Sequence, residues 1–110
     1  FRACIRCGAI LSQASPEQLD ALSRYGAHIG LAFQIVDDIL DIVGEKKILG
    51  KDVGSDLDKS KATYPALFGL EKSKKKAAGL VEEAIASLDD FDERADPLRD
   101  IARFFVERTF

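Results

Sequence analysis

The sequence contains no methionine, only one histidine and only two cysteines. No apolar run reaches the roughly 18 residues that a membrane-spanning helix needs, and we expect no signal peptide before "FRACIRCGAIL". Cys4 and Cys7 form one C-x-x-C pair, without the second pair or the histidine pair that a zinc site requires. We therefore expect reduced, packed cysteines, no membrane span and a cytoplasmic location. The missing methionine and an apolar, helix-like opening suggest a fragment.

The residues that are present favour one compact soluble domain. Hydrophobic residues make up 46% of the 110 residues and charged residues 32%, which is typical of a globular chain. The net charge is −3, and no continuous basic face balances the 19 acidic residues, so we expect no nucleic-acid partner. The sequence shows no strand alternation, internal repeat or low-complexity linker, which predicts an all-α fold.

Helix signals divide the chain into segments. A first helix is expected over residues 1–13, and "SPEQ" then offers Ser15 as N-cap, Pro16 as first helical residue and Gln18 to complete a capping box. The long helix that follows should end at about residue 43, where Gly44 can stop it. Residues 50–58 have the composition of a loop. Further helices are expected around residue 65, over an amphipathic stretch beginning near residue 71, and from residue 97.

Three aspartates share one side of the long helix. With Asp37 placed at 0° and about 100° per residue, Asp41 lies at about 40°, Gln34 at about 60° and Asp38 at about 100°. The opposite sector of the helix collects apolar side chains that we expect to be buried: Ile29, Leu31, Ala32, Ile35, Val36, Ile39, Leu40, Ile42 and Val43.

Clustered carboxylates beside a core are costly unless they are neutralised. Carboxylates at i and i+4 suit Mg²⁺, which accepts one or two protein carboxylates and is often completed by substrate phosphates. Lys51, Lys61 and the Gly54–Ser55 turn are candidate phosphate partners. Taken alone, a DDxxD helix is more often an exposed acidic face. Neither acidic segment has the spacing of an EF-hand loop.

The sequence around these aspartates favours a metal site over an exposed acidic face. "GLAFQIVDDILD" followed by "LGKDVGSDLDKSKATYPALFGL" resembles the second aspartate-rich region of trans-isoprenyl diphosphate synthases, the polyprenyl synthetase family, and looks most like its bacterial farnesyl diphosphate synthase members. The resemblance implies that residues 1–110 are the C-terminal portion of one polyprenyl synthetase domain, without its first aspartate-rich motif. It also implies part of the all-α isoprenoid synthase helical bundle and a homodimer for the intact enzyme.

The resemblance further implies an activity and roles for individual residues. The reaction is Mg²⁺-dependent prenyl transfer, in which isopentenyl diphosphate condenses with an allylic diphosphate to give farnesyl or geranylgeranyl diphosphate. Asp37 would bind Mg²⁺ directly, Asp38 and Asp41 would support the metal or its waters, and Asp56 would contribute through water. Gln34, Lys51 and Lys61 would contact the allylic diphosphate, with Asp37 and Lys51 acting in catalysis.

Two other functions stay open: a non-catalytic regulatory subunit homologous to prenyl synthases, and a class I terpene cyclase. A cyclase usually carries an Asn/Asp-Ser/Thr-Glu metal motif on this helix, and "DDILD" is different. A regulatory subunit would have less reason to keep all the residues that bind metal and diphosphate. Prenyl transfer is therefore preferred, with the fragment expected to be inactive alone.

Several other residues have weaker signals. "DDFDE" at residues 89–93 is interpreted as solvated surface, and His28 as a hydrogen-bonded packing residue deep in the apolar sector. Gly26, Gly30 and Phe33 either shape a cavity wall or serve helix packing. The resemblance implies a basic C-terminal end that can close over the diphosphates, which would include Arg103 and Arg108, but this sequence ends in "RTF" without the expected basic tail.

Overall fold

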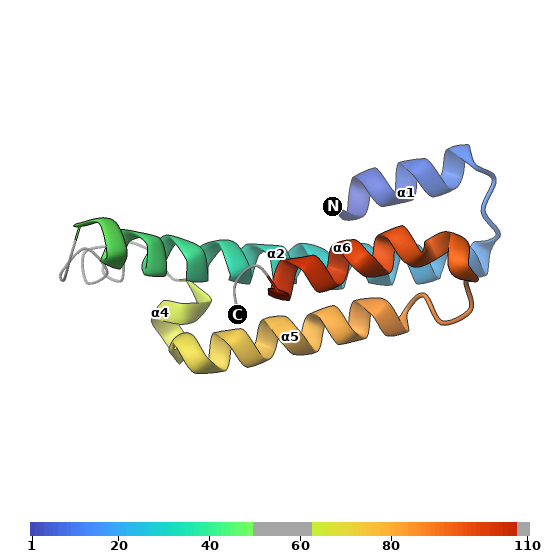
Figure 1. Cartoon of the computed structure of the whole chain (residues 1–110). Helices are drawn as coiled ribbons and strands as arrows, with labels where there is room; N and C mark the ends of the chain where they lie inside the picture. The colour runs from blue at the N-terminus through green and yellow to red at the C-terminus, as the bar shows by residue number, and fades with distance from the viewer. Residues whose placement is uncertain (50–62, 108–110) are drawn as a thin grey trace.

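Helix α2 (Pro16–Leu49) lies at the centre of the fold, and each of the other α-helices contacts it (Figure 1). The computed structural model describes residues 1–49 and 63–107. These comprise α1 (Arg2–Leu11), α2, α4 (Tyr64–Phe68), α5 (Leu70–Ala86), the 3-10 turn η1 (Glu93–Ala95) and α6 (Asp96–Glu107). The described ranges contain helices and turns but no strand, which confirms the all-α prediction. None of their helices is both long and apolar enough to cross a membrane.

The start of α2 follows the predicted capping box. The Ser15 backbone N–H donates to Gln18 Oε1 at 2.9 Å, and the Gln18 backbone N–H donates to Ser15 Oγ at 3.1 Å. The predicted end of the helix at Gly44 is wrong, because α2 continues to Leu49. A glycine inside a helix costs only about 1 kcal/mol relative to alanine. It ends a helix when it adopts a left-handed conformation, and Gly44 does not have a positive φ.

The core lies mainly between α2 and α5, with α6 closing it. As the sequence predicted, the α2 residues Ile29, Ile35 and Ile39 are buried. On the amphipathic stretch of α5, the apolar positions predicted to share one face are Ala77, Leu80, Val81, Ala84, Ile85 and Leu88. All are buried except Ile85, which is half-buried, and Leu88 follows the helix. On α2, however, Leu31 is 49% exposed and Val43 is 42% exposed, so the expectation that the whole apolar sector is buried is wrong. The sector is wide, and the helices described here cover only part of it.

Helix α1 packs on α2 through its Ile5 and Ala9 side, where a close backbone approach requires glycine. A Cβ added at Gly26 would lie 2.9 Å from the Arg2 Cα, so Gly26 allows the two helices to meet. The Phe33 ring contacts Phe1 and Phe105, with ring centroids 5.0 and 5.2 Å apart, and so joins α1, α2 and α6. These contacts favour helix packing as the role of both residues.

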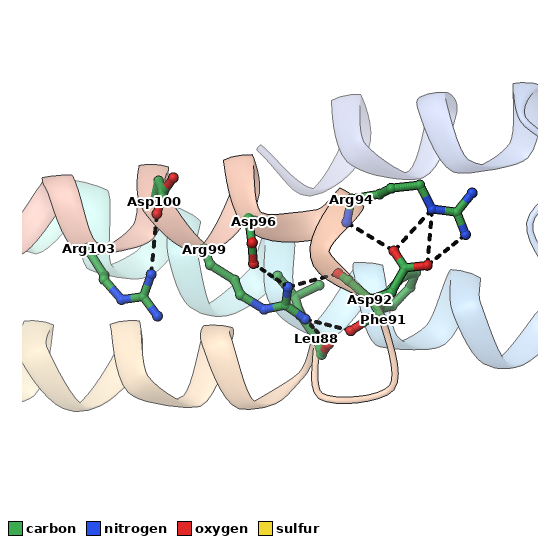
Figure 2. A network of polar contacts seen from close by, with 8 residues as sticks. All are labelled: Leu88, Phe91, Asp92, Arg94, Asp96, Arg99, Asp100 and Arg103. Carbon is green, nitrogen blue, oxygen red and sulfur yellow. Dashed lines mark hydrogen bonds and ion pairs between the residues drawn. The ribbon is translucent and has the colours of Figure 1, made fainter.

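The Arg99 guanidinium holds the turn between α5 and α6 (Figure 2). The Arg99 side chain is only 15% exposed. It donates to the backbone carbonyls of Leu88 at 2.7 Å, Phe91 at 2.8 Å and Asp92 at 2.9 Å. A fourth bond, at 2.8 Å, reaches the Asp96 carboxylate. One side chain therefore donates to three carbonyls of the segment between the two helices, and those of Leu88 and Asp92 accept a backbone N–H as well.

The "DDFDE" segment is surface, as predicted. Asp89, Asp90 and Glu93 are exposed, and Asp92 is the N-cap of η1, with its carboxylate accepting from the Arg94 backbone N–H at 3.0 Å. The Arg94 guanidinium also donates to this carboxylate, which lowers the pKa of Asp92 below its ordinary range. The segment follows α5 and supplies the N-cap of η1, which is a structural role.

Tyr25→Phe is expected to lower the free energy of unfolding by about 1 kcal/mol, because the buried Tyr25 hydroxyl donates to the Leu98 carbonyl at 2.7 Å. Burial also raises the pKa of Tyr25 above its ordinary value of about 10. The folded chain then holds this proton more tightly than the unfolded chain does. The stabilising contribution of the protonated Tyr25 hydroxyl is complete below about pH 10. It is lost as the pH rises through the pKa of Tyr25 in the folded chain.

Urea unfolding of both chains at neutral pH and above about pH 10 measures this effect. Tyr64→Phe is the matched control, because Tyr64 is only half-buried. If the Tyr25→Phe chain lost as much stability at high pH as the unsubstituted chain does, ionisation of Tyr25 would not be the cause of the loss.

Candidate functional site

The predicted aspartate face lies on α2, beyond the part that packs against α1. Gln34 and Asp41 are exposed, and Asp37 and Asp38 are half-buried. Gln34 Nε2 donates to Asp38 Oδ1 at 3.1 Å, one helical turn away. This bond fixes the amide beside the carboxylate. The four residues therefore occupy one sector of α2, as the helical spacing predicted.

A groove of about 550 Å³ runs beside this face, between α2 and α4. Gln34, Asp38 and Asp41 line it on the α2 side. The structure thus brings these three predicted residues together at one cavity. Asp37 is not among the lining residues, since it lies about 100° around the helix from Asp38 and about 40° from Asp41.

The opposite wall of the groove was not predicted. It consists of Thr63, Tyr64 and Leu67, and Leu31 and Ile35 complete the lining on the α2 side. Thr63 is the N-cap of α4, and its hydroxyl accepts from the Ala66 backbone N–H at 3.3 Å. The cap sets the start of α4, and the i, i+3 spacing places Tyr64 and Leu67 on one side of it. A polar α2 wall therefore faces a largely apolar α4 wall.

The chemistry of the donors fits a hard cation in part. Asp37 and Asp41 stand at i and i+4, and carboxylate oxygens are ligands that Mg²⁺ accepts. Within residues 1–49 and 63–107, no group of three or more acidic, histidine or cysteine side chains is arranged to hold a metal by itself. The α2 face fits as one part of a coordination shell that water and phosphate oxygens would complete.

Three other predicted site residues, Lys51, Asp56 and Lys61, lie outside the described residues. The predicted diphosphate contacts of these lysines therefore stay predictions. Arg108 lies outside the described residues too, whereas Arg103 contacts Asp100 at 3.3 Å.

His28 lies at the edge of the interface between α2 and α5. Its side chain is 33% exposed, and its Nδ1 lies 3.4 Å from Glu83 Oε2. The expected polar contact is therefore present, but the expected deep burial is wrong. The Glu83 side chain, 60% exposed, makes this edge polar.

Comparison with known proteins places this helical arrangement in a family. The polyprenyl synthetase family model matches residues 1–101. The chain belongs to the polyprenyl synthetase family. This confirms the resemblance found in "GLAFQIVDDILD" and the segment after it.

Individual relatives within the polyprenyl synthetase family are similar over nearly the whole chain. The chain is 47% identical to a dimethylallyltranstransferase of Fischerella ambigua (strain UTEX 1903), covering 99% of this chain and 32% of the relative. It is 47% identical to a geranylgeranyl diphosphate synthase of Cyanophora paradoxa, covering 98% and 36%. It is 41% identical to the farnesyl diphosphate synthase of Escherichia coli (strain K12), covering 98% and 38%. The chain thus spans about a third of the length of these relatives.

Proposed function

We propose that this chain is the C-terminal portion of a polyprenyl synthetase domain that catalyses Mg²⁺-dependent prenyl transfer. The complete enzyme would condense isopentenyl diphosphate with an allylic diphosphate, giving farnesyl or geranylgeranyl diphosphate. The observation that carries the proposal is the grouping of Gln34, Asp38 and Asp41 along one groove, within the sequence pattern that resembles the family's second aspartate-rich region.

The carboxylates of α2 would hold the metal, with Asp37 as direct ligand and Asp38, Asp41 and, through water, Asp56 in support. Bound there, Mg²⁺ would supply Lewis-acid chemistry and offset the negative charge of the diphosphate. The bond between Gln34 and Asp38 uses one N–H of the Gln34 amide, which leaves a second N–H to donate to a diphosphate oxygen.

Lys51 and Lys61 would offset the charge that grows on the departing diphosphate, which is the form of stabilisation that contributes most to such reactions. The groove supports a prenyl substrate at this face of α2, because its charged α2 side faces Tyr64 and Leu67. An apolar wall of this kind suits the hydrocarbon part of an allylic substrate and helps to exclude water from the reacting carbon.

The oligomeric state and the location of the complete enzyme are part of the same proposal. We expect a homodimer in the cytoplasm. Size-exclusion chromatography with light scattering would measure the oligomeric state directly.

A product assay tests the activity. The complete enzyme, with Mg²⁺ and isopentenyl diphosphate, should extend dimethylallyl or geranyl diphosphate by five carbons at each step. The 110-residue chain alone should give no sustained product, because it supplies one aspartate-rich face and catalysis depends on holding both substrates in place. Cyclised hydrocarbon formed without isopentenyl diphosphate would instead indicate a terpene cyclase. A chain that only altered the product of another synthase would be a regulatory subunit.

A further inference from the structure

The chain turns sharply between α4 and α5, and a single residue makes the turn (Figure 1). Gly69 is both the C-cap of α4 and the N-cap of α5, with φ 88° and ψ 163°. This backbone conformation is open essentially only to glycine, because the Cβ of any other L-residue would crowd the adjacent peptide groups. The direction of α4 relative to α5 therefore depends on glycine at this position.

Hydrogen bonds to both helices hold the turn. The Gly69 backbone N–H donates to the Pro65 carbonyl of α4 at 2.9 Å. The Gly69 carbonyl accepts twice from α5, from the Ser73 backbone N–H at 3.1 Å and from Ser73 Oγ at 2.7 Å. Pro65 and Ser73 are both buried by the described helices themselves. The turn is thus fixed by internal contacts, whatever covers the surface of the complete enzyme.

The helix that this turn directs carries one wall of the groove beside the aspartate face. Tyr64 and Leu67 line that wall, and α4 contacts both α2 and α5. The Tyr64 ring also packs on the Phe68 ring, with centroids 4.6 Å apart, just before Gly69. Because α4 is only five residues long, a change of its direction at Gly69 would displace the whole wall relative to α2.

We propose that Gly69, held by Ser73, is a positioning residue for the allylic substrate of prenyl transfer. The inference rests on the proposed function, in which the groove takes the allylic diphosphate. Gly69 acts through Tyr64 and Leu67, which its backbone keeps opposite the carboxylates of α2. The hydrocarbon part of the substrate then lies along α4 while its diphosphate lies at α2. With alanine in place of Gly69 the turn would relax to a negative φ, and α4 would lose this alignment.

Gly69→Ala in the complete enzyme tests the proposal. With Mg²⁺ present, the KM for the allylic diphosphate should rise about tenfold, because the strain of alanine in this conformation is relieved by moving α4. The KM for isopentenyl diphosphate should change less than about twofold, because none of the residues that Gly69 positions is proposed to contact it. An unchanged allylic KM, or an equal rise in both KM values, would overturn the positioning role. If the unsubstituted enzyme formed no prenyl product, the proposed function itself would be refuted, and the inference with it.

Gly79→Ala is the matched control on α5. A Cβ at Gly79 or at Gly69 meets no atom of the described residues within 4 Å, but Gly79 lies inside the helix and has no positive φ. Gly79→Ala should therefore leave the allylic KM within about twofold of its original value. An equal rise in the two variants would show that the φ of Gly69 is not the cause, and would overturn the proposal.

Ser73→Ala keeps the test decisive if Gly69→Ala does not fold, which circular dichroism checks. This variant retains the glycine and a good helix former, but it removes the hydroxyl that donates to the Gly69 carbonyl. The allylic KM should rise about threefold, and the KM for isopentenyl diphosphate should not. An unchanged allylic KM would overturn the role of the turn.

A double-variant cycle identifies the path from Gly69 to the substrate. Leu67→Ala should raise the allylic KM about fivefold in the otherwise unsubstituted enzyme, because it removes apolar contact with the hydrocarbon. In the Gly69→Ala enzyme the same substitution should raise it less than about twofold, since Leu67 is already displaced there. Effects that simply multiply would show that Gly69 does not act through α4, and would overturn the proposal.

Discussion

Asp37→Ala is expected to lower turnover of the complete enzyme by about a hundredfold or more, because Asp37 is the proposed direct ligand of the metal that stabilises charge on the diphosphate. Asp90→Ala is the matched control. Asp90 also lies in an acidic run, but it is exposed whereas Asp37 is half-buried, it follows α5, and it is not among the residues that line the groove. Steady-state product formation with both substrates measures the two effects.

Comparing Asp37→Ala with Asp90→Ala distinguishes the loss of a metal ligand from the loss of one surface charge. Both substitutions remove one negative charge, and neither removes a core side chain. Asp90→Ala should leave turnover within about twofold, since exposed surface substitutions usually have small effects. If Asp90→Ala reduced turnover as strongly as Asp37→Ala, the "DDFDE" segment would have a catalytic role and its interpretation as surface would be wrong.

Arg99→Leu is expected to lower the free energy of unfolding by about 2 kcal/mol, which is a large part of the stability of a small domain. The substitution keeps an apolar stem but removes the donors to three backbone carbonyls in the turn after α5 (Figure 2). The Leu88 and Asp92 carbonyls would keep the backbone N–H groups of Phe91 and Ala95 as donors, whereas the Phe91 carbonyl would lose the Arg99 donor. An acceptor left without a partner costs more than the net value of a surface ion pair. Urea unfolding followed by circular dichroism measures the change.

Arg103→Leu is the control on the same helix. Arg103 is 52% exposed, and its bond to Asp100 is 3.3 Å long, so its removal should cost less than about 1 kcal/mol. Equal losses in the two variants would mean that the carbonyls find water when Arg99 is gone. A large loss for Arg99 alone would show that this residue fixes α6, whose Phe105 packs on Phe33 next to Gln34.

Local signals in the sequence predicted most of the helices. The capping box of Ser15 and Gln18 needs only neighbouring residues, and the three-four spacing on α5 identifies its buried face without knowledge of its partner. The same helical geometry placed Gln34, Asp38 and Asp41 in one sector. These features depend on interactions within a turn or two of the chain, which is why the sequence alone predicts them.

The features that the sequence did not predict correctly depend on distant contacts or on small energy differences. Gly44 continues the helix because its cost is small. Cys4 and Cys7 look like core residues by type, and only the docking of α1 on α2 leaves both exposed in the described structure. The wall of the groove formed by Tyr64 and Leu67 requires α4 to lie across α2, which is a tertiary contact. The family resemblance identified the residues around the aspartates but not this wall.

We expect the aspartate face of α2 to bind Mg²⁺ chiefly together with a diphosphate. Isothermal titration of the complete enzyme with Mg²⁺, in the presence and absence of an unreactive allylic diphosphate analogue, tests it most directly. Because the α2 carboxylates supply only part of a coordination shell, Mg²⁺ should bind at least about tenfold more tightly when phosphate oxygens are present. Asp37→Ala should abolish that difference. Equal Mg²⁺ affinity with and without the analogue would mean that the diphosphate is not part of the metal site.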